Sequence, residues 1–307
     1  MPRPAFIVRA TAPFRSLEFA IAHPSYPNVF HFYAMSEFPS SPKILVSSDG
    51  TKIYADASGD TSKPSIIFVH GLGLSGAVFD RIFSDKRYTE HFYLVRYDMR
   101  GHGRSGKPIN GEGYASNLFA DDFAVVMKAF NLHKPVFVGW SFGATIPVDI
   151  ATNFSDIPLA DVIYLCGVPY TSSIVQQIAT PEILSLVPGL TSEDSVVTAL
   201  SITREFVDLL FLDATKIPWE LLVLWTHHDS LSSGNKDFCY LFLGGAYDRL
   251  IMSNVVADKM RPYFKNLEVH LIEKGGSHAV FFENQDETMD KIIDFTQRVN
   301  GHENVCS

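Results

Sequence analysis

"VFVGWSFGAT" (residues 136–145) sets a single serine, Ser141, between two glycines immediately after an apolar run. Residues 136–138 are typical of a short buried strand, and the small residues after Gly143 lead into a segment that can pack as a helix. Ser141 therefore falls at a strand-to-helix turn, where small neighbours allow a tight backbone and an outward-facing hydroxyl. An ordinary helix cap after a glycine turn is the alternative, and this pattern alone leaves both interpretations open.

Strand and helix patterns alternate on both sides of this turn. Residues 43–59 alternate around an Asp-Gly turn, which predicts a β-hairpin. Helical spacing is clearest over residues 113–133, and a last helix is predicted at 287–300. Buried strand-like runs occupy residues 65–71, 91–99, 135–141, 161–167, 237–245 and 267–276. The alternation predicts an α/β fold with a doubly wound, mostly parallel sheet covered on both faces.

A helical insertion interrupts this alternation. After Pro169 about 65 residues show helical patterns only, and then the strand pattern resumes. We therefore expect a core domain formed by residues 43–169 and 236–307, with a helical cap at 170–235.

The first 42 residues form a separate N-terminal arm in this scheme. They hold many aromatics and prolines but no continuous apolar core of a secretory signal. We favour an ordered arm packed on the domain, because so many aromatic side chains are costly to leave in water. A transit peptide is the alternative, since Arg3, Arg9 and Arg15 precede the first acid, Glu18. Cytoplasm is the default localisation.

Composition narrows the class of partner. The chain has 307 residues, 46% of them hydrophobic, which is enough for a full core. With 25 basic and 34 acidic residues the net charge is −9, and no basic run marks a face for nucleic acid. The apolar runs are too short for a membrane span. Cys166, Cys239 and Cys306 lie far apart, so the sequence encodes no disulfide framework or metal cluster. Cys166 and Cys239 lie in apolar strand-like runs and are expected to be buried free thiols.

Reactive side chains gather after the predicted strands. In a doubly wound sheet the carboxyl ends of the strands meet at one edge, where loops converge on a crevice. The residues just past the strands include 70–73 (His-Gly-Leu-Gly), 98–103 (Asp-Met-Arg-Gly-His-Gly), Ser141, Asp248 and His278. The sequence therefore predicts a serine, a carboxylate and a histidine at the same edge.

The order Ser141, Asp248, His278 is the chain order of the α/β-hydrolase triad. Over roughly residues 43–300 the chain resembles the α/β-hydrolase fold family. The shared motifs are "HGLG", "DMRGHGRSGKP", "GWSFG", "GGAYD" and "GGSHAVFFE". The N-terminal arm and the cap carry no matching motif.

The resemblance implies a role for each residue. Ser141 is the expected nucleophile, and His278 is expected to take its proton and return it to the leaving group. Asp248 is expected to orient His278 and stabilise its charged form. The backbone N–H groups of Leu72 and Phe142 are the expected oxyanion hole. No cofactor and no metal is expected.

The other polar residues near these motifs are expected to be structural. We predict that His70 and His102 bond neighbouring loops, and that Asp98 and Arg100 form a structural ion pair or loop bonds. The predicted cap also contains Trp219, Trp225, His227 and His228. These four either line a substrate pocket or pack a surface helix, and we favour the second interpretation.

The identity of the expected nucleophile limits the type of reaction that the chain could catalyse. Relatives that attack an sp³ carbon, such as epoxide hydrolases and haloalkane dehalogenases, use an aspartate, because a serine would leave an ether. Ser141 therefore indicates attack on a carbonyl carbon. We expect a serine hydrolase for a carboxylic ester, or a lactone or thioester, with a small to medium apolar substrate suited to the apolar cap.

Other readings of the same site stay open. One alternative is carbon–carbon hydrolysis, or perhydrolysis as in relatives similar to cofactor-free haloperoxidases, some of which have a tryptophan before the serine as Trp140 is here. Another is a ligand receptor with little turnover. The oligomeric state is open.

Overall fold

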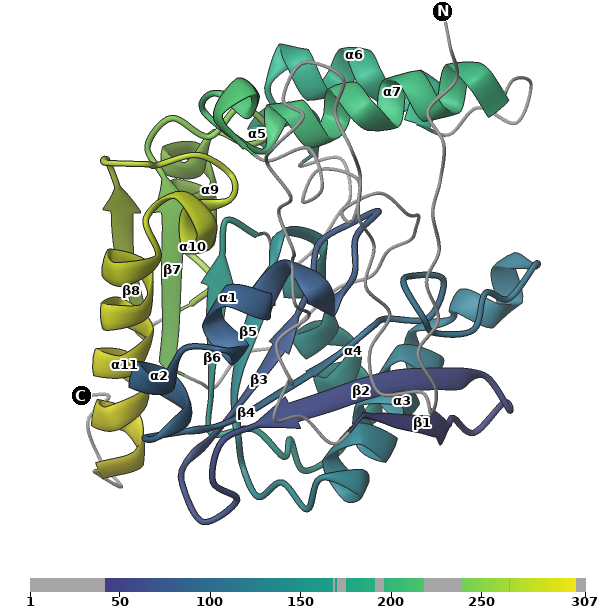
Figure 1. Ribbon diagram of the computed structural model, residues 1–307, viewed down its shortest axis with the longest axis vertical. Coiled ribbons are helices and arrows are strands. Elements are labelled where there is room, and N and C mark those ends of the chain that lie inside the picture. The colour runs from purple at the N-terminus through teal and green to yellow at the C-terminus, as the bar shows by residue number, and fades with distance from the viewer. Residues whose placement is uncertain are drawn as a thin grey trace, which may run out of the picture. The chain divides into compact units, whose positions relative to one another are not determined.

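The computed structural model describes residues 42–167, 169, 175–190, 196–217, 239–264 and 266–301 (Figure 1). The predicted arm lies outside these ranges except for residue 42. The described ranges also leave out four residues of the predicted cap: Trp219, Trp225, His227 and His228.

One eight-stranded sheet runs through the described part of the chain in the order β1-β2-β4-β3-β5-β6-β7-β8. β2 is antiparallel to β1 and β4, and every other neighbouring pair is parallel. The strands are β1 (Lys43–Val46), β2 (Lys52–Ser58), β3 (Ser65–Val69), β4 (Tyr93–Tyr97), β5 (Val136–Trp140), β6 (Asp161–Leu165), β7 (Cys239–Gly245) and β8 (Asn266–Ile272). The predicted hairpin and the mostly parallel α/β sheet are confirmed.

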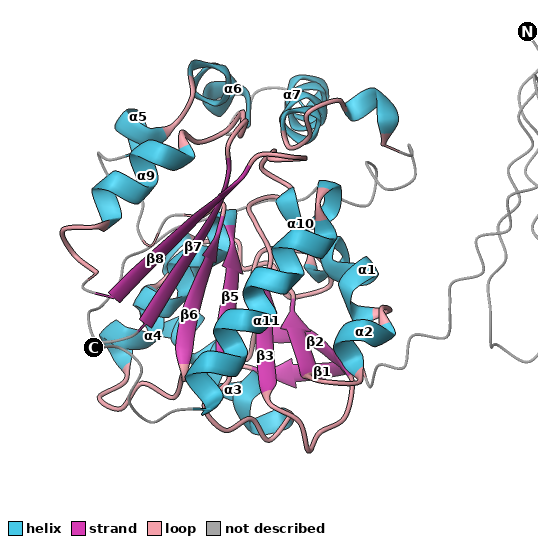
Figure 2. Ribbon diagram, turned by 90° about the vertical axis from the view of Figure 1, so that its left-hand side faces the viewer, coloured by secondary structure: helices cyan, strands magenta, loops and turns pink. Residues whose placement is uncertain are grey.

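Helices cover both faces of this sheet, as Figure 2 shows. Successive residues of β3 point to opposite faces, so Phe68 and Ile67 belong to two different buried clusters. The first cluster includes residues of α1 (Asp80–Phe83), α10 (Val280–Glu283) and α11 (Gln285–Gly301). The second includes residues of α3 (Ser116–Ala129), α4 (Ile146–Asn153) and α9 (Ser253–Met260). The remaining short elements include α2 (Lys86–Thr89), η1 (Gly76–Phe79), η2 (Gly111–Tyr114), η3 (Ser141–Thr145) and η4 (Ala214–Lys216).

Among the described residues, three α-helices lie between β6 and β7 in the sequence. They are α5 (Val175–Ile178), α6 (Pro181–Leu190) and α7 (Val196–Leu209). In both views α6 and α7 lie side by side beyond the carboxyl ends of the strands (Figures 1 and 2). Their buried faces, with Leu186 and Phe206, join the first core cluster. The helical pattern predicted after Pro169 is therefore observed, whereas the limits of the cap stay a prediction.

The cysteines differ from the prediction in part. Cys166 is a buried free thiol, as expected. Cys239 is disulfide-bonded, so the prediction of a free thiol was wrong there. Cys239 is the first residue of β7 and is only partly buried, whereas the other residues of the strand are buried, so the apolar run does not enclose it fully.

The described helices include none that is both long enough and apolar enough to cross a membrane.

A buried carboxyl group in α4 makes the stability depend on pH. Asp149 is 1% exposed and accepts a hydrogen bond of 2.6 Å from the hydroxyl of Ser116. Burial raises the pKa of Asp149 to about 7, and the bond from Ser116 offsets only part of that effect. The folded chain therefore holds the proton more tightly than the unfolded chain, and this group's contribution to stability is lost as pH rises from about 4 to about 7.

Asp149→Asn is expected to remove this pH dependence while keeping an oxygen acceptor for Ser116. The variant should match the wild type near pH 4 and exceed its free energy of unfolding by about 2 kcal/mol at pH 8, with a ceiling of about 4 kcal/mol. Urea unfolding of both proteins at several pH values measures the difference. Asp294→Asn, at an exposed position of α11, is the control. A difference that does not grow with pH would contradict the prediction.

Candidate active site

Ser141 occupies a strained turn between β5 and η3. Its φ is +53°, in the left-handed region that residues with a side chain rarely adopt. The flanking glycines are required by close packing. A Cβ on Gly143 would lie 2.4 Å from the carbonyl oxygen of Val69, and one on Gly139 would lie 2.6 Å from the Cα of Ala144. The turn therefore holds the serine in one fixed place at the carboxyl end of β5.

Ser141, His278 and Asp248 form a continuous chain of hydrogen bonds. The distance from Ser141 Oγ to His278 Nε2 is 2.8 Å, and from His278 Nδ1 to Asp248 Oδ2 it is 2.7 Å. The side chains of His278 and Asp248 are 1% and 0% exposed. A carboxylate can only accept, so Nδ1 carries the proton and Nε2 accepts from the serine hydroxyl. This is the arrangement that a general base needs.

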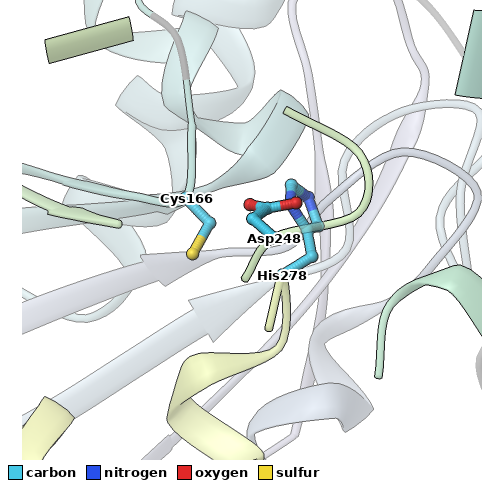
Figure 3. A group of neighbouring side chains, drawn as sticks. All are labelled: Cys166, Asp248 and His278. Atoms are coloured by element: carbon cyan, nitrogen blue, oxygen red, sulfur yellow. The ribbon is translucent and has the colours of Figure 1, made fainter. Parts of the chain in front are cut away.

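The backbone after Asp248 fixes the orientation of its carboxylate. Oδ1 accepts hydrogen bonds from the N–H groups of Leu250 at 2.8 Å and Ile251 at 3.1 Å. Since Oδ1 is held by the loop, Oδ2 is left to face the imidazole. Figure 3 shows the carboxylate of Asp248 directed toward the ring of His278.

Trp140 supports His278 from the other side, a contact that the sequence analysis missed. Its indole N–H donates to the carbonyl oxygen of His278 at 2.8 Å, and the two ring centroids lie 5.7 Å apart. The indole is fully buried and meets Phe281 edge to face at 4.8 Å. The residue before Ser141 thus helps to hold His278 in place.

His70 joins two loops at this edge, as predicted for a structural residue. Its Nδ1 donates to the carbonyl oxygen of Gly71 at 2.8 Å, and its Nε2 accepts from the N–H of Met99 at 3.0 Å. Burial lowers the pKa of His70, which keeps the ring neutral and able to accept from Met99. His102 lies beside it, with ring centroids 5.1 Å apart, and its Nδ1 is 3.0 Å from the carbonyl oxygen of Arg100.

The loop held by His70 lies against Ser141. A Cβ on Gly71 would come within 3.0 Å of the Cβ of Ser141, so only a glycine fits without displacing the serine. Leu72 follows in this loop, and Phe142 follows Ser141 at the start of η3. Use of their N–H groups as an oxyanion hole stays a prediction.

Asp98 and Arg100 do not bond each other. Asp98 accepts from the backbone N–H groups of Gly76 and Arg104, both at 2.8 Å, and pairs with the Arg104 guanidinium at 3.3 Å. Arg100 is fully buried and pairs with Asp122 of α3 at 2.7 Å and with Asp49 at 2.9 Å. Both predicted kinds of contact, structural ion pairs and loop bonds, are therefore present.

Cys166 lies beside Asp248 and His278 and was not predicted to do so. Its sulfur, the Asp248 carboxylate and the His278 ring place donor atoms within 4.8 Å of one another (Figure 3). Burial and the nearby charge of Asp248 raise the pKa of the thiol well above its usual value. A protonated thiol is a poor metal ligand, and Asp248 and His278 are already bonded to each other, so these donors fit a metal poorly. In the sequence, the feature that could have indicated this location is the position of Cys166 at the end of a predicted strand.

Comparison with known proteins agrees with this architecture. Residues 64–164 match the family model described as alpha/beta hydrolase fold. The esterase RhEst1 from Rhodococcus sp. ECU1013 superposes with a TM-score of 0.69 at 20% identity, over 84% of this chain and 99% of that one. The chain has the α/β-hydrolase fold.

Two curated relatives share part of this α/β-hydrolase core. The 2-(acetamidomethylene)succinate hydrolase of Mesorhizobium japonicum is 33% identical over 36% of this chain and 37% of its own length. The bifunctional esterase/perhydrolase DCH of Acinetobacter calcoaceticus is 31% identical over 41% of this chain and 44% of its own length. The likeness thus extends over less than half of either relative.

Proposed function

We propose that the chain is a serine hydrolase that cleaves a carboxylic ester through an acyl-enzyme on Ser141. The observation that carries this proposal is the hydrogen-bonded chain from Ser141 through His278 to Asp248, with the serine on a strained turn at the carboxyl edge of the sheet. A serine hydroxyl is a weak nucleophile, and the imidazole of His278, 2.8 Å away, is placed to act as the base that it needs.

The geometry supports a two-step acyl transfer. Ser141 Oγ attacks the carbonyl carbon while its proton passes to His278 Nε2, and Asp248 stabilises the resulting imidazolium. The carbonyl oxygen becomes an oxyanion that faces the N–H groups of Leu72 and Phe142. The ester C–O bond then breaks, and the alcohol leaves with the proton from His278. Water repeats the sequence on the acyl-enzyme, and the carboxylic acid is released.

The proposal includes an apolar substrate of small to medium size. The helices α6 and α7, beyond the carboxyl edge of the sheet, are rich in apolar residues, and their buried side chains include Leu186 and Phe206. Helices of this composition favour an apolar substrate over a charged one. The name of the structural neighbour RhEst1, an esterase, agrees with this choice.

A fluorophosphonate probe and a panel of p-nitrophenyl esters test the proposal. Labelling of Ser141, located by peptide mapping, together with p-nitrophenol release from acetate, butyrate or octanoate, is the expected result. Labelling of Ser141 without ester turnover would overturn the ester substrate and indicate another acyl-transfer substrate. Neither labelling nor turnover would overturn it and favour a ligand receptor.

Perhydrolysis is the second candidate, and Trp140 favours it. The curated relative from Acinetobacter calcoaceticus is named as both esterase and perhydrolase. In this reaction hydrogen peroxide replaces water in the second step, so the product is a peracid. Peracid formation from an ester in added peroxide, absent in Ser141→Ala, would support it, and ester hydrolysis with no peracid would exclude it.

A further inference from the structure

Thr180 connects the helices beyond the sheet edge to the loop that carries Asp248. Its hydroxyl donates to the carbonyl oxygen of Arg249 at 2.5 Å, and its backbone N–H donates to the carbonyl oxygen of Leu250 at 2.9 Å. The same hydroxyl accepts from the N–H of Ile183 at 3.4 Å in the first turn of α6. Thr180 is only 8% exposed, so water competes little for these bonds.

Thr180 is linked to Asp248 through Leu250. Leu250 and Ile251 are the residues whose N–H groups hold Asp248 Oδ1. On either side of Thr180 the two segments are also paired. Ala179 forms an antiparallel bridge with Ile251, and the N–H of Met252 donates to the carbonyl oxygen of Ile178 at 2.7 Å. The position of the Asp248 carboxylate is thus fixed from the start of α6.

The far end of the same helical segment is bonded to the loop that carries the base. The carbonyl oxygen of Leu210 accepts from the N–H of Ala279, next to His278, at 3.0 Å. The N–H of Leu212 donates to Glu283 Oε2 at 3.1 Å. The acid and the base are therefore held, through their own loops, by the two ends of one segment.

We propose that Thr180 is a positioning residue for Asp248, through which the helical segment α5–α7 sets the geometry of the triad. This inference rests on the proposed function of Ser141, His278 and Asp248. Thr180 acts through Arg249 and Leu250 and does not touch the reacting atoms. Loss of its hydroxyl loosens the loop, so Asp248 orients His278 less well while the substrate surroundings are unchanged.

Thr180→Val tests the proposal, because valine keeps the shape and removes only the hydroxyl. We expect kcat to fall about three- to tenfold, the range for loss of one buried neutral hydrogen bond, with KM within about twofold. Thr180→Ser keeps the hydroxyl and should retain near wild-type kcat. Thr203→Val is the matched control, because residue Thr203 is also 8% exposed, but its hydroxyl donates to the carbonyl oxygen of Ala199 within α7, at 2.7 Å.

The rate of fluorophosphonate labelling gives a second readout that needs no substrate. In that reaction Ser141 Oγ displaces fluoride from phosphorus and its proton passes to His278, so the rate reports on the activation of Ser141 without any ester turnover. Labelling should slow in Thr180→Val and not in Thr180→Ser or Thr203→Val. If Thr180→Val does not fold, Thr180→Ala is compared with Thr203→Ala.

The outcomes separate this proposal from the proposed function. Equal rates in Thr180→Val and Thr203→Val, with an active wild type, would overturn the role of Thr180 alone. An equal loss in Thr180→Ser would overturn it too, since the hydroxyl would not be the cause. A wild type that is neither labelled nor active would overturn both.

Discussion

Ser141→Ala should lower kcat for a p-nitrophenyl ester by a factor of about 10⁵–10⁶. The variant has no oxygen to form the acyl-enzyme, and His278 is left without the proton that it is placed to accept. KM should change little, because the serine hydroxyl contributes little to ground-state binding. The substitution adds no atom and keeps a Cβ at a φ of +53°, so we expect the melting temperature to stay within a few degrees of the wild type.

Ser84→Ala is the control for this measurement. Ser84 is exposed after α1, and its hydroxyl bonds the carbonyl oxygen of Asp80 at 2.8 Å, far from any proposed role in catalysis. Its kcat should equal that of the wild type. Turnover by Ser141→Ala within tenfold of the wild type would show that the hydrolysis does not pass through this serine.

Asp248→Asn should lower kcat by a factor of about 10³–10⁴. In the variant the amide oxygen remains the acceptor for the N–H groups of Leu250 and Ile251, so the NH₂ group is turned toward His278. An NH₂ group can only donate, which forces the imidazole to accept at Nδ1 and to carry its proton on Nε2. Nε2 then has no lone pair for the proton of Ser141.

A single substitution thus tests both the identity and the orientation of the acid. Asp258→Asn, at an exposed position of α9, is the control and should keep the wild-type rate. Steady-state kinetics on one ester, with unfolding curves for each protein, is sufficient. A loss of less than tenfold in Asp248→Asn would mean that another group orients the imidazole.

The sequence predicted the fold and the three side chains of the proposed triad for a physical reason. In a parallel sheet every strand ends at the same edge, so Ser141, Asp248 and His278 are brought together by topology although they are far apart in the chain. The strand patterns located those ends to within a few residues, and the structure places the three side chains in hydrogen-bonding contact.

The supporting contacts could not be predicted in the same way. The bond from Trp140 to the His278 carbonyl and the bonds of Thr180 to the Asp248 loop join loops and helices whose approach no periodic pattern encodes. Cys166 shared the positional signal of the triad residues, but its apolar run indicated only a buried thiol. Cys239 was wrongly predicted to be a free thiol, because an apolar run does not indicate which other segments lie near its partly buried first residue.

The sheet order has a consequence for the chain while it is being synthesised. Ser141 directly follows the central strand β5, Asp248 follows β7, and His278 comes last, after β8, which in the described part of the chain pairs with β7 at the edge of the sheet. A nascent chain that ends before His278 therefore carries an ordinary alcohol at Ser141, whatever has already folded. If the proposed function is correct, incomplete products of translation that lack His278 are expected to be inactive.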